Sequence, residues 1–295
     1  MGEDIATPLC ESQKPVGDAL LRSIGKGKSV KVVANGKHTA RSVLLTGATG
    51  GIGMELAKRY ARPGRTLILW GRNPERLTEI ATTCCTRGSA VFTRQIDLCD
   101  GEAALAAFEA DYADHKPDLV ILGAGLSDIQ PLDSMTEDPQ KVLQLAQVNY
   151  ATPVALATAA AQNMIPNGGG HIALIGSVAG FYELPCSPAY SSSKCGLDFF
   201  ARAAGLAWED KGVSLTLIVP GFIDTPMSRR LEGPRPFLVS AKSAARRIIR
   251  TIAKRKKVYI FPWPFRVLRV LERLLPQCLR ERILRSLIVG QKERQ

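Results

Sequence analysis

The chain has 295 residues, of which 45% are hydrophobic and 22% are charged. These proportions exclude a wholly disordered or fibrous protein, and a chain this long can bury a sizeable core without disulfides or metal ions. The net charge of +12 is concentrated at the end of the chain: residues 250–295 hold 13 Lys or Arg and three Asp or Glu, whereas residues 42–249 are nearly neutral.

Residues 1–41 mix Gly, Lys and Pro with little apolar periodicity, and we predict a partly disordered N-terminal extension there. Glu3 and Asp4 make its start acidic and no apolar segment follows, so no secretory signal is predicted. The seven cysteines include no CxxC pair, and no histidine is spaced to complete a zinc site, so we expect no metal. Adjacent Cys84 and Cys85 suit a disulfide poorly, which favours reduced thiols in a cytoplasmic protein.

From residue 42 to residue 262, short aliphatic runs alternate with helical patterns. The runs predict strands at 43–46, 66–70, 90–96, 119–122, 171–176, 213–219 and 257–261, and the intervening patterns predict helices near 52–62, 74–85, 101–114, 137–163, 188–210 and 240–254. Continuous apolar runs indicate strands buried on both faces, and intervening helices indicate parallel pairing. We therefore predict an α/β fold, a doubly wound parallel sheet of about seven strands with the Rossmann architecture.

A glycine-rich segment, TGATGGIG at residues 46–53, joins the first strand to the first helix. Glycines let the backbone turn sharply and approach a pyrophosphate, whose charge the helix N-terminus favours; a tight strand-to-helix corner is the alternative interpretation. The TGxxxGxG spacing resembles that of the short-chain dehydrogenase/reductase family, in its single-domain branch, and the resemblance covers residues 42 to about 262. It implies a nicotinamide dinucleotide as cofactor.

The end of the second strand bears on the choice of cofactor. An acidic residue there would bind the adenosine ribose and select NAD, but Gly71 vacates that place, and Arg72 can face a 2′-phosphate. We therefore expect NADP(H) in preference to NAD(H), the alternative being a solvated arginine at a helix start. The resemblance assigns the pair Asp97 and Leu98 to the adenine.

Two further turns belong to the expected cofactor site. The family usually has Asn-Ala-Gly after the fourth strand, and this chain departs from it with Gly123-Ala124-Gly125. After the sixth strand, residues 220–227 resemble the turn that borders the nicotinamide. The resemblance thus implies cofactor contacts from Thr46, Gly47, Thr49, Gly51, Ile52, Gly53, Arg72, Asp97, Leu98, Ala124, Gly125, Tyr190, Lys194, Pro220, Gly221, Ile223 and Thr225.

Tyr190 and Lys194 are spaced four residues apart at the start of a predicted helix, so they lie on one face a single turn apart. A nearby ammonium favours a phenolate, and we expect it to bring the pKa of the phenol towards neutrality. Ser177, at the end of the fifth strand, can hold a substrate oxygen beside the tyrosine. The resemblance adds Asn149, which implies a catalytic set of Asn149, Ser177, Tyr190 and Lys194 for hydride transfer between carbonyl and alcohol.

The final segment, residues 263–295, is predicted to be a basic amphipathic helical tail. On a helical wheel Arg266, Arg269 and Arg273 gather on one side and aliphatic residues cover the other, until Pro276 interrupts the pattern. Such a helix is typical of a bilayer interface with anionic lipid. The alternatives are packing on the body or on a partner subunit with the arginines outward, or nucleic acid, for which no recognition motif is present.

These patterns together predict an NADP(H)-dependent short-chain oxidoreductase, a reductase acting on a small-molecule or lipid-like carbonyl. We expect a homo-oligomer, cytoplasmic or peripheral at the inner face of a membrane, that does not bind nucleic acid. Two alternatives remain open: a subunit acting with a partner on a lipid-linked sugar or lipid, similar to some membrane-associated members of the family, and a non-catalytic nucleotide sensor or scaffold. The segment 228–240, where the family has its substrate lid, carries three arginines that either recognise an anionic substrate or are solvated.

Overall fold

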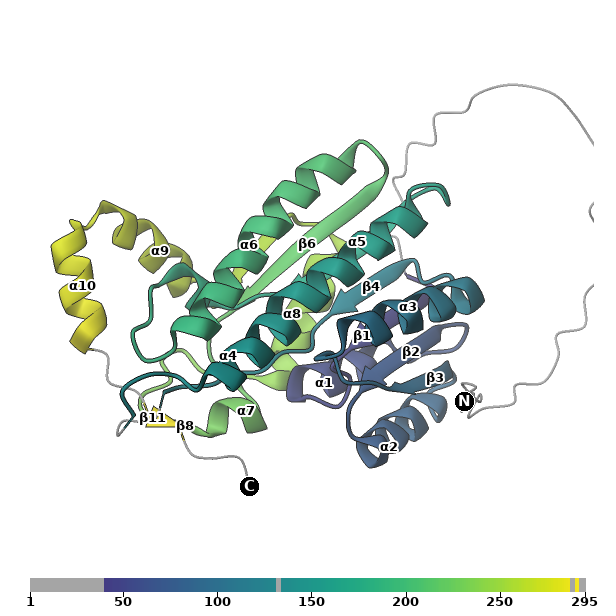
Figure 1. Ribbon diagram of the computed structural model, residues 1–295. Helices are drawn as coiled ribbons and strands as arrows, with labels where there is room; N and C mark the ends of the chain where they lie inside the picture. Colours follow the sequence, from purple (N-terminus) through teal and green to yellow (C-terminus); the bar gives the residue numbers. More distant parts are fainter. Residues whose placement is uncertain (1–39, 131–133, 287–289, 292–295) are drawn as a thin grey trace, which may run out of the picture.

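The computed structural model describes residues 40–130, 134–286 and 290–291, so nearly all of the predicted N-terminal extension lies outside the described residues. A seven-stranded parallel sheet forms the centre of the molecule (Figure 1). Its order is β10-β6-β5-β4-β1-β2-β3. The strands are β1 (Ser42–Thr46), β2 (Thr66–Gly71), β3 (Ala90–Gln95), β4 (Leu119–Leu122), β5 (Gly170–Ile175), β6 (Val213–Pro220) and β10 (Val258–Phe261). The prediction of a doubly wound parallel sheet is confirmed.

Helices cover both faces of this sheet. One face carries α1 (Gly51–Tyr60), α2 (Pro74–Cys85) and α8 (Ala241–Ala253), and the other carries α3 (Gly101–His115), α5 (Thr152–Met164) and α6 (Pro188–Glu209). The chain reverses its direction of travel across the sheet between β1 and β4. In open parallel sheets, ligands bind at the carboxyl ends of the strands beside such a reversal.

The predicted helix 137–163 is divided into three pieces. These are α4 (Pro139–Ala146), a π-helical turn (Gln147–Ala151) and α5. Pro153 lacks the N–H that would bond the carbonyl of Asn149, so the regular hydrogen-bond ladder is interrupted there. Shorter elements complete the site side of the sheet: the 3₁₀ turn η2 (Val178–Phe181), α7 (Pro226–Arg229) and the strands β7 (Ile223–Asp224), β8 (Leu231–Glu232) and β9 (Val239–Ser240).

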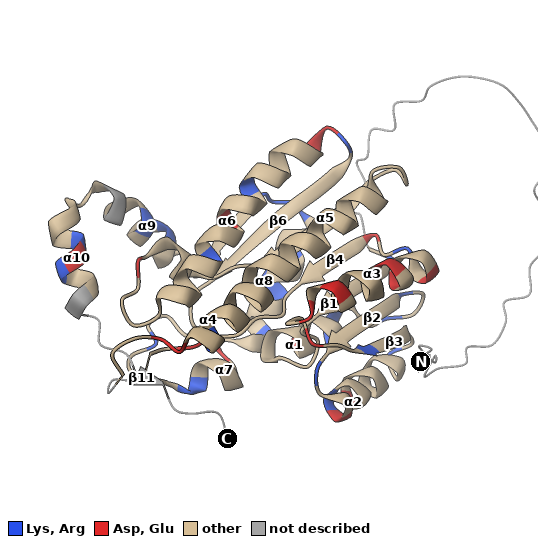
Figure 2. Cartoon of the chain, viewed as in Figure 1, with Lys and Arg blue, Asp and Glu red and all other residues tan. Residues whose placement is uncertain are grey.

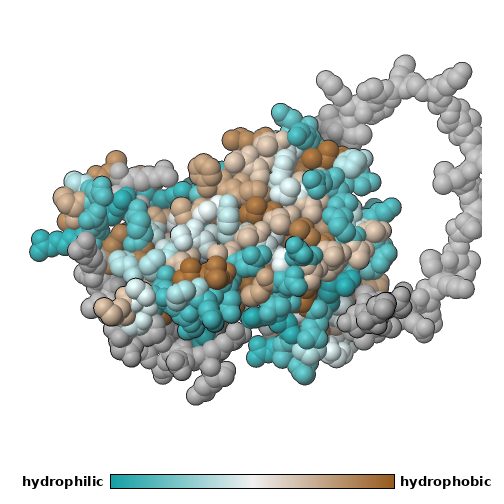
Figure 3. Space-filling model, viewed as in Figure 1, coloured by the Kyte–Doolittle hydropathy of each residue, from teal (hydrophilic) through white to brown (hydrophobic). Residues whose placement is uncertain are grey.

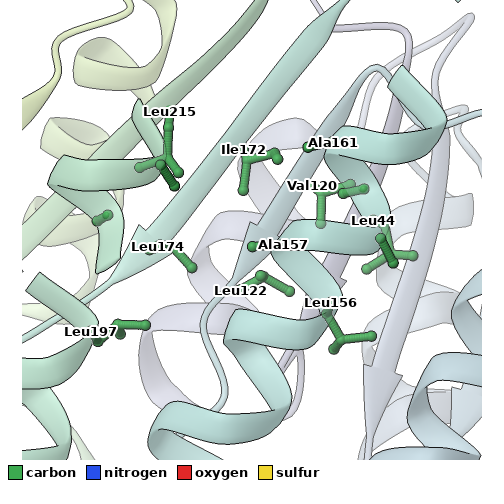
Figure 4. Close-up of a cluster of buried hydrophobic side chains, with 14 of the residues drawn as sticks. Leu44, Val120, Leu122, Leu156, Ala157, Ala161, Ile172, Leu174, Leu197 and Leu215 are labelled. Atoms are coloured by element: carbon green, nitrogen blue, oxygen red, sulfur yellow. The ribbon is translucent and has the colours of Figure 1, made fainter. Parts of the chain in front are cut away.

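The buried core consists of two layers, one on each face of the sheet. Successive residues of β1 point to opposite faces: Leu44 belongs to one layer, and Val43 and Leu45 belong to the other. Figure 4 shows the first layer, to which Leu44 and Ile172 from the strands and Leu156 and Ala161 from α5 all contribute. Because both faces of each central strand are buried, its sequence is continuously apolar.

The C-terminal tail forms α9 (Pro264–Leu274), α10 (Gln277–Ser286) and β11 (Gly290–Gln291), and β11 pairs with β8. The break between the helices falls at Pro276, as predicted. Figure 1 shows the two helices projecting from the side of the body next to α6. Among the helices of the described residues, none combines the length and the apolarity needed to cross a membrane.

The tail helix α9 packs on the body with Arg269 turned inward, whereas Arg266 is exposed. The Arg269 guanidinium lies 3.8 Å from the centre of the Phe181 ring, and one of its nitrogens is 3.6 Å from a carboxylate oxygen of Asp198. Val270 and Leu274 are 59% and 77% exposed. The expected alternative of a packed helix with its arginines outward therefore fails at Arg269, because η2 and α6 supply an aromatic ring and a carboxylate that hold this residue inward.

Candidate active site

The glycine-rich segment predicted to cradle a phosphate follows β1 directly and opens α1. Gly47 has φ of +72°, in the left-handed region that glycine tolerates. A Cβ at Gly53 would collide with the carbonyl oxygen of Gly47, and one at Gly51 would lie 2.6 Å from the Thr225 methyl group. The loop is thus closely folded, and the structure brings the predicted residues 46–53 together with Thr225.

The N-terminus of α1 is open to a ligand. Its N-cap residue, Gly50, makes no side-chain cap, and the first turn of the helix carries no acidic residue. Unsatisfied N–H groups and the positive end of the helix dipole therefore point out of this turn. That arrangement fits the pyrophosphate of a dinucleotide cofactor.

Thr46 secures the loop after β4, where the family's asparagine is replaced by Gly123. Its hydroxyl accepts hydrogen bonds from the N–H groups of Gly123, at 3.1 Å, and Ala124, at 3.2 Å. Gly47 lies against the same loop, since a Cβ there would be 2.8 Å from the Ala124 Cα. The loop is therefore held by Thr46 in spite of the departure from the family motif, a contact that the sequence analysis did not anticipate.

The end of β2 packs closely against Thr49. A Cβ at Gly71 would lie 2.8 Å from the Thr49 methyl group, which excludes an acidic side chain in this place. The helix cap that follows is made by Asn73, whose side-chain oxygen accepts the N–H of Arg76 at 2.7 Å. Arg72 itself is exposed and lies close enough to Cys99 for its charge to oppose the burial that raises the pKa of that thiol.

Asp97 and Leu98, predicted to contact the adenine, follow β3 in the same region. The Asp97 carboxylate accepts the backbone N–H of Cys99 at 3.0 Å, which holds the turn after the strand. Leu98 is buried, and its carbonyl accepts a hydrogen bond from the Thr152 hydroxyl at 2.8 Å. Since the charge of Arg72 reaches this turn, the two predicted ends of the adenosine site are neighbours.

Ser177, Tyr190 and Lys194 meet at the carboxyl end of β5. Ser177 begins η2, and its side chain hydrogen-bonds with the phenol of Tyr190. Lys194 is 5% exposed, its Nζ donates to the carbonyl of Ile175 at 3.2 Å, and it lies 6.0 Å from the centre of the Tyr190 ring. The three side chains predicted to act together are therefore brought to one place by β5, η2 and α6.

The pKa values of this group are governed by burial. Burial raises the pKa of Tyr190, and the hydrogen bond from Ser177 opposes the rise. Burial also lowers the pKa of Lys194 to about 8. The expectation that Lys194 brings the phenol towards neutrality is wrong for this arrangement, because desolvation dominates at the phenol and the ammonium bonds to the Ile175 carbonyl. The phenol is consequently protonated at neutral pH.

Asn149 lies in the π-helical turn and is completely buried. Its amide holds the backbone of Leu126, accepting the N–H at 2.8 Å and donating to the carbonyl at 2.9 Å. A Cβ at Gly125 would lie 3.2 Å from Asn149 Oδ1 and 3.4 Å from Lys194 Nζ. Gly125 is thus the small residue that lets the side chains of Asn149 and Lys194 both approach the loop after β4, a role that its place in the sequence did not reveal.

The turn after β6 carries the last predicted cofactor residues. Gly221 follows Pro220, the last residue of β6, and its N–H donates a hydrogen bond to the carbonyl of Phe261 at 2.8 Å. Its open side is filled by the Phe265 ring, which a Cβ at Gly221 would strike. Ile223 is buried beneath the turn. Sequence reasoning placed Phe265 in a separate tail, and no local pattern indicates that it packs against the nicotinamide-side turn.

The arginines of the predicted lid segment are partly engaged. Arg229 forms an ion pair with Asp224 at 2.7 Å, and Arg235 donates to the carbonyl of Ser228 at 3.4 Å. The lid therefore presents fewer uncommitted cations than its sequence suggests. Within the described residues, no group of three or more His, Cys, Asp or Glu side chains is placed to hold a metal ion.

Comparison with known proteins decides the family. The model of the short chain dehydrogenase family matches residues 41–235. The chain belongs to the short-chain dehydrogenase/reductase family. An uncharacterised oxidoreductase of Mycobacterium tuberculosis (strain H37Rv) is 32% identical over 242 residues, covering 81% of this chain and 95% of that protein. A hydroxysteroid 11-beta-dehydrogenase 1-like protein of Gallus gallus is 32% identical and covers 79% of this chain and 83% of its own length.

A solved structure supports the same assignment. A short-chain dehydrogenase from Sphingobium yanoikuyae in complex with NADPH superimposes with a TM-score of 0.70 and 26% identity, over 84% of this chain and 96% of that one. As a short-chain dehydrogenase/reductase, the protein is an NAD(P)-dependent oxidoreductase that acts on small-molecule carbonyl or alcohol substrates. The fit of the open α1 terminus to a pyrophosphate agrees with that cofactor class.

Proposed function

We propose that the protein is an NADP(H)-dependent reductase that converts a carbonyl to an alcohol. The observation that carries the proposal is the meeting of Ser177, Tyr190 and Lys194 at the end of β5, with burial raising the pKa of the tyrosine. A phenol that keeps its proton is set to donate it, and reduction of a carbonyl requires a proton donor at the substrate oxygen.

The bound nicotinamide cofactor supplies the hydride for the substrate carbon. Tyr190 donates its proton to the substrate oxygen as the C=O π bond opens, and the Ser177 hydroxyl stabilises the charge that develops there. Lys194 lies next to the phenol and carries a positive charge below pH about 8, which favours the phenolate left behind. Asn149 holds the Leu126 backbone beside Gly125 and so fixes the wall that Lys194 faces.

The test of these roles is Tyr190→Phe, which removes the transferable proton and keeps the ring. We expect loss of NADPH oxidation with an accepted carbonyl substrate, with nearly unchanged NADPH binding. Tyr182→Phe, the same change in a neighbouring tyrosine, serves as the control and should retain activity. Substantial turnover by Tyr190→Phe would contradict the proposal.

The preference for NADP(H) is proposed from Arg72. Its guanidinium is exposed beside the Asp97 turn, and Gly71 leaves no acidic side chain to repel a 2′-phosphate. We expect Arg72→Asp to weaken NADPH binding and improve NADH binding. Arg76→Asp, one turn into α2, should leave both affinities unchanged. Equal affinity of the unmodified protein for both cofactors would remove the basis of this assignment.

We also propose that the tail binds an anionic membrane surface, which fits a lipid-like substrate. Val270, Leu271 and Leu274 of α9 are more than half exposed, and Phe237 of the lid segment, 51% exposed, meets the Phe265 ring edge-on at 5.7 Å. Phe237 thus adds an exposed apolar residue beside the start of α9. Cosedimentation with anionic vesicles that weakens with salt tests this, and no cosedimentation at low salt would refute it.

A homo-oligomer is proposed from the outer side of α4 and α6. Leu143, Phe199 and Leu206 are 72%, 76% and 69% exposed there, and contacts between copies would remove them from water. Light scattering should report an oligomer that Phe199→Ser with Leu206→Ser dissociates. A monomeric unmodified protein would refute the proposal.

A further inference from the structure

A basic pocket of about 330 Å³ lies where α9 meets α6 and β10. Four of its lining side chains are cationic, and they come from three different parts of the chain. Its lining consists of Arg202, Lys256, Val258, Tyr259, Ile260, Arg266 and Arg269. None of these residues belongs to the predicted catalytic or cofactor set, and Figure 2 shows Lys and Arg positions on both α6 and α9.

The positive charge of this pocket is only partly balanced. Asp198 serves two of the four cations: it forms an ion pair with Arg202 at 2.8 Å and with Arg269 at 3.6 Å. Within the described part of the chain, no carboxylate lies within ion-pair distance of Lys256 or Arg266. Among the described residues, Lys256 and Arg266 therefore carry positive charge that an anion of more than one oxygen, such as a phosphate, would neutralise.

An exposed apolar surface borders the pocket. Arg266 and Val270 are neighbours one turn apart on α9, so the basic side of the helix passes directly into its apolar side. Leu271 and Leu274 continue that side at 52% and 77% exposure, and Trp263, just before the helix, is 70% exposed. Figure 3 shows apolar residues beside polar ones on the projecting tail. A free phosphate would contact the basic pocket but not the apolar surface, whereas a phospholipid has a phosphate for the pocket and acyl chains for the apolar surface.

We infer that the basic pocket binds the phosphate of an anionic phospholipid while the apolar side of α9 lies among the acyl chains of the bilayer. Arginine is well suited to phosphate oxygens because its planar fork donates two parallel hydrogen bonds. Exposed tryptophan is typical of the boundary between headgroups and chains. The inference rests on the proposed membrane binding of the tail and gives it a defined headgroup site, and it is independent of the hydride-transfer chemistry.

The pocket is close to the reacting group. Arg269 reaches from the pocket to the ring of Phe181, in the same 3₁₀ turn that Ser177 begins. Phe265, four residues before Arg269, packs on Gly221 of the turn after β6. A bilayer held at α9 would therefore lie on the side of the molecule where substrate approaches Ser177, which suits a carbonyl substrate dissolved in the membrane.

The test compares two double variants of the full chain. Lys256→Gln with Arg266→Gln removes the two cations of the pocket that have no carboxylate partner among the described residues. Arg246→Gln with Arg250→Gln removes the same charge from exposed positions of α8 on the other face of the sheet. Binding is measured by cosedimentation with phosphatidylcholine vesicles with and without phosphatidylglycerol. Unchanged NADPH binding shows that each variant is folded.

The pocket variant should bind anionic vesicles about thirty-fold more weakly, the loss expected for two headgroup contacts, and the α8 variant should lose less than about threefold. Pure phosphatidylcholine should bind both variants and the unmodified protein equally. Equal losses in the two variants would overturn the inference in favour of diffuse attraction. Saturable binding of inorganic phosphate without vesicle binding, or a dimer that Leu271→Ser dissociates without vesicle binding, would also overturn it. NADPH oxidation in solution, measured separately, reports on the reductase proposal alone.

Discussion

Replacing Phe265 by alanine tests whether the start of the tail is part of the catalytic body. Phe265 is 6% exposed, it fills the open side of Gly221, and its ring meets those of Phe222 and Phe237 at 6.4 and 5.7 Å. Removing a buried phenylalanine side chain costs about 3–5 kcal/mol, because the lost burial adds to the cavity left behind. We expect Phe265→Ala to reduce the free energy of unfolding by about that amount.

Leu271→Ala on the same helix is the matched control. Leu271 is 52% exposed on the outward side of α9, and substitutions at such surface positions change stability by about 0.5 kcal/mol or less. Urea unfolding followed by circular dichroism measures both variants. NADPH titration should also show weaker binding for Phe265→Ala alone, because the turn at Gly221 loses the ring that supports it.

Two results would refute this reasoning. If Phe265→Ala were as stable as Leu271→Ala, the ring would not be a buried part of the body. If Phe265→Ala were destabilised while its NADPH affinity stayed that of the unmodified protein, Phe265 would stabilise the fold without supporting the Gly221 turn.

Three further predictions concern other parts of the site and the core. Gly53→Ala should abolish NADPH binding measured by fluorescence titration, because the new methyl group would strike the carbonyl oxygen of Gly47; retained affinity would show that the loop can shift. Gly125→Ala should lower the rate of NADPH oxidation more than NADPH affinity, because its methyl group would lie 3.2 Å from Asn149 Oδ1 and 3.4 Å from Lys194 Nζ and so displace the loop beside Lys194; an unchanged rate would contradict this. Burial lowers the pKa of His171 from 6.5 to about 3. Between these two pH values the imidazole is protonated in the unfolded chain and neutral in the folded chain. Stability should therefore fall by about 2 kcal/mol more between pH 7 and pH 5 in the unmodified protein than in His171→Leu, measured by urea unfolding; equal pH profiles would refute it.

The fold and the reacting group could be predicted because their signals are local. The five central strands are buried on both faces and are therefore apolar along most of their length, and helices between the strands impose parallel order. The spacing of Tyr190 and Lys194 is one turn of a single helix, so it survives in any environment that keeps that helix. The division of helix 137–163 was not predicted, although Pro153 is in the sequence. A proline removes one helical hydrogen bond, and the sequence alone does not say whether the helix then kinks or breaks.

Contacts between distant segments could not be predicted in the same way. The bonds from Gly123 and Ala124 to Thr46 link residues 77 and 78 positions apart, and they exist because β1 and β4 are neighbours in the sheet. The pKa of Tyr190 depends on how much water the surrounding elements exclude, so the spacing to Lys194 alone predicted the wrong direction. The partners of a residue and its exposure to water depend on how the layers assemble. The sequence motif identifies which residues form the site but not these two properties.

The orientation of α9 shows what a helical pattern leaves undecided. The wheel predicts that basic and apolar residues occupy opposite sides, but the usual assumption places the apolar side on the body. Here the body offers Arg269 the ring of Phe181 and the carboxylate of Asp198, and these satisfy a guanidinium that would otherwise be expensive to bury. Phe265 is buried in that contact, whereas Leu271 and Leu274 face outward. A helix held to its body through Arg269 and the Phe265 ring leaves its apolar side available to something outside it, and a bilayer with anionic headgroups matches that side and the cations Arg266 and Lys256 along its border.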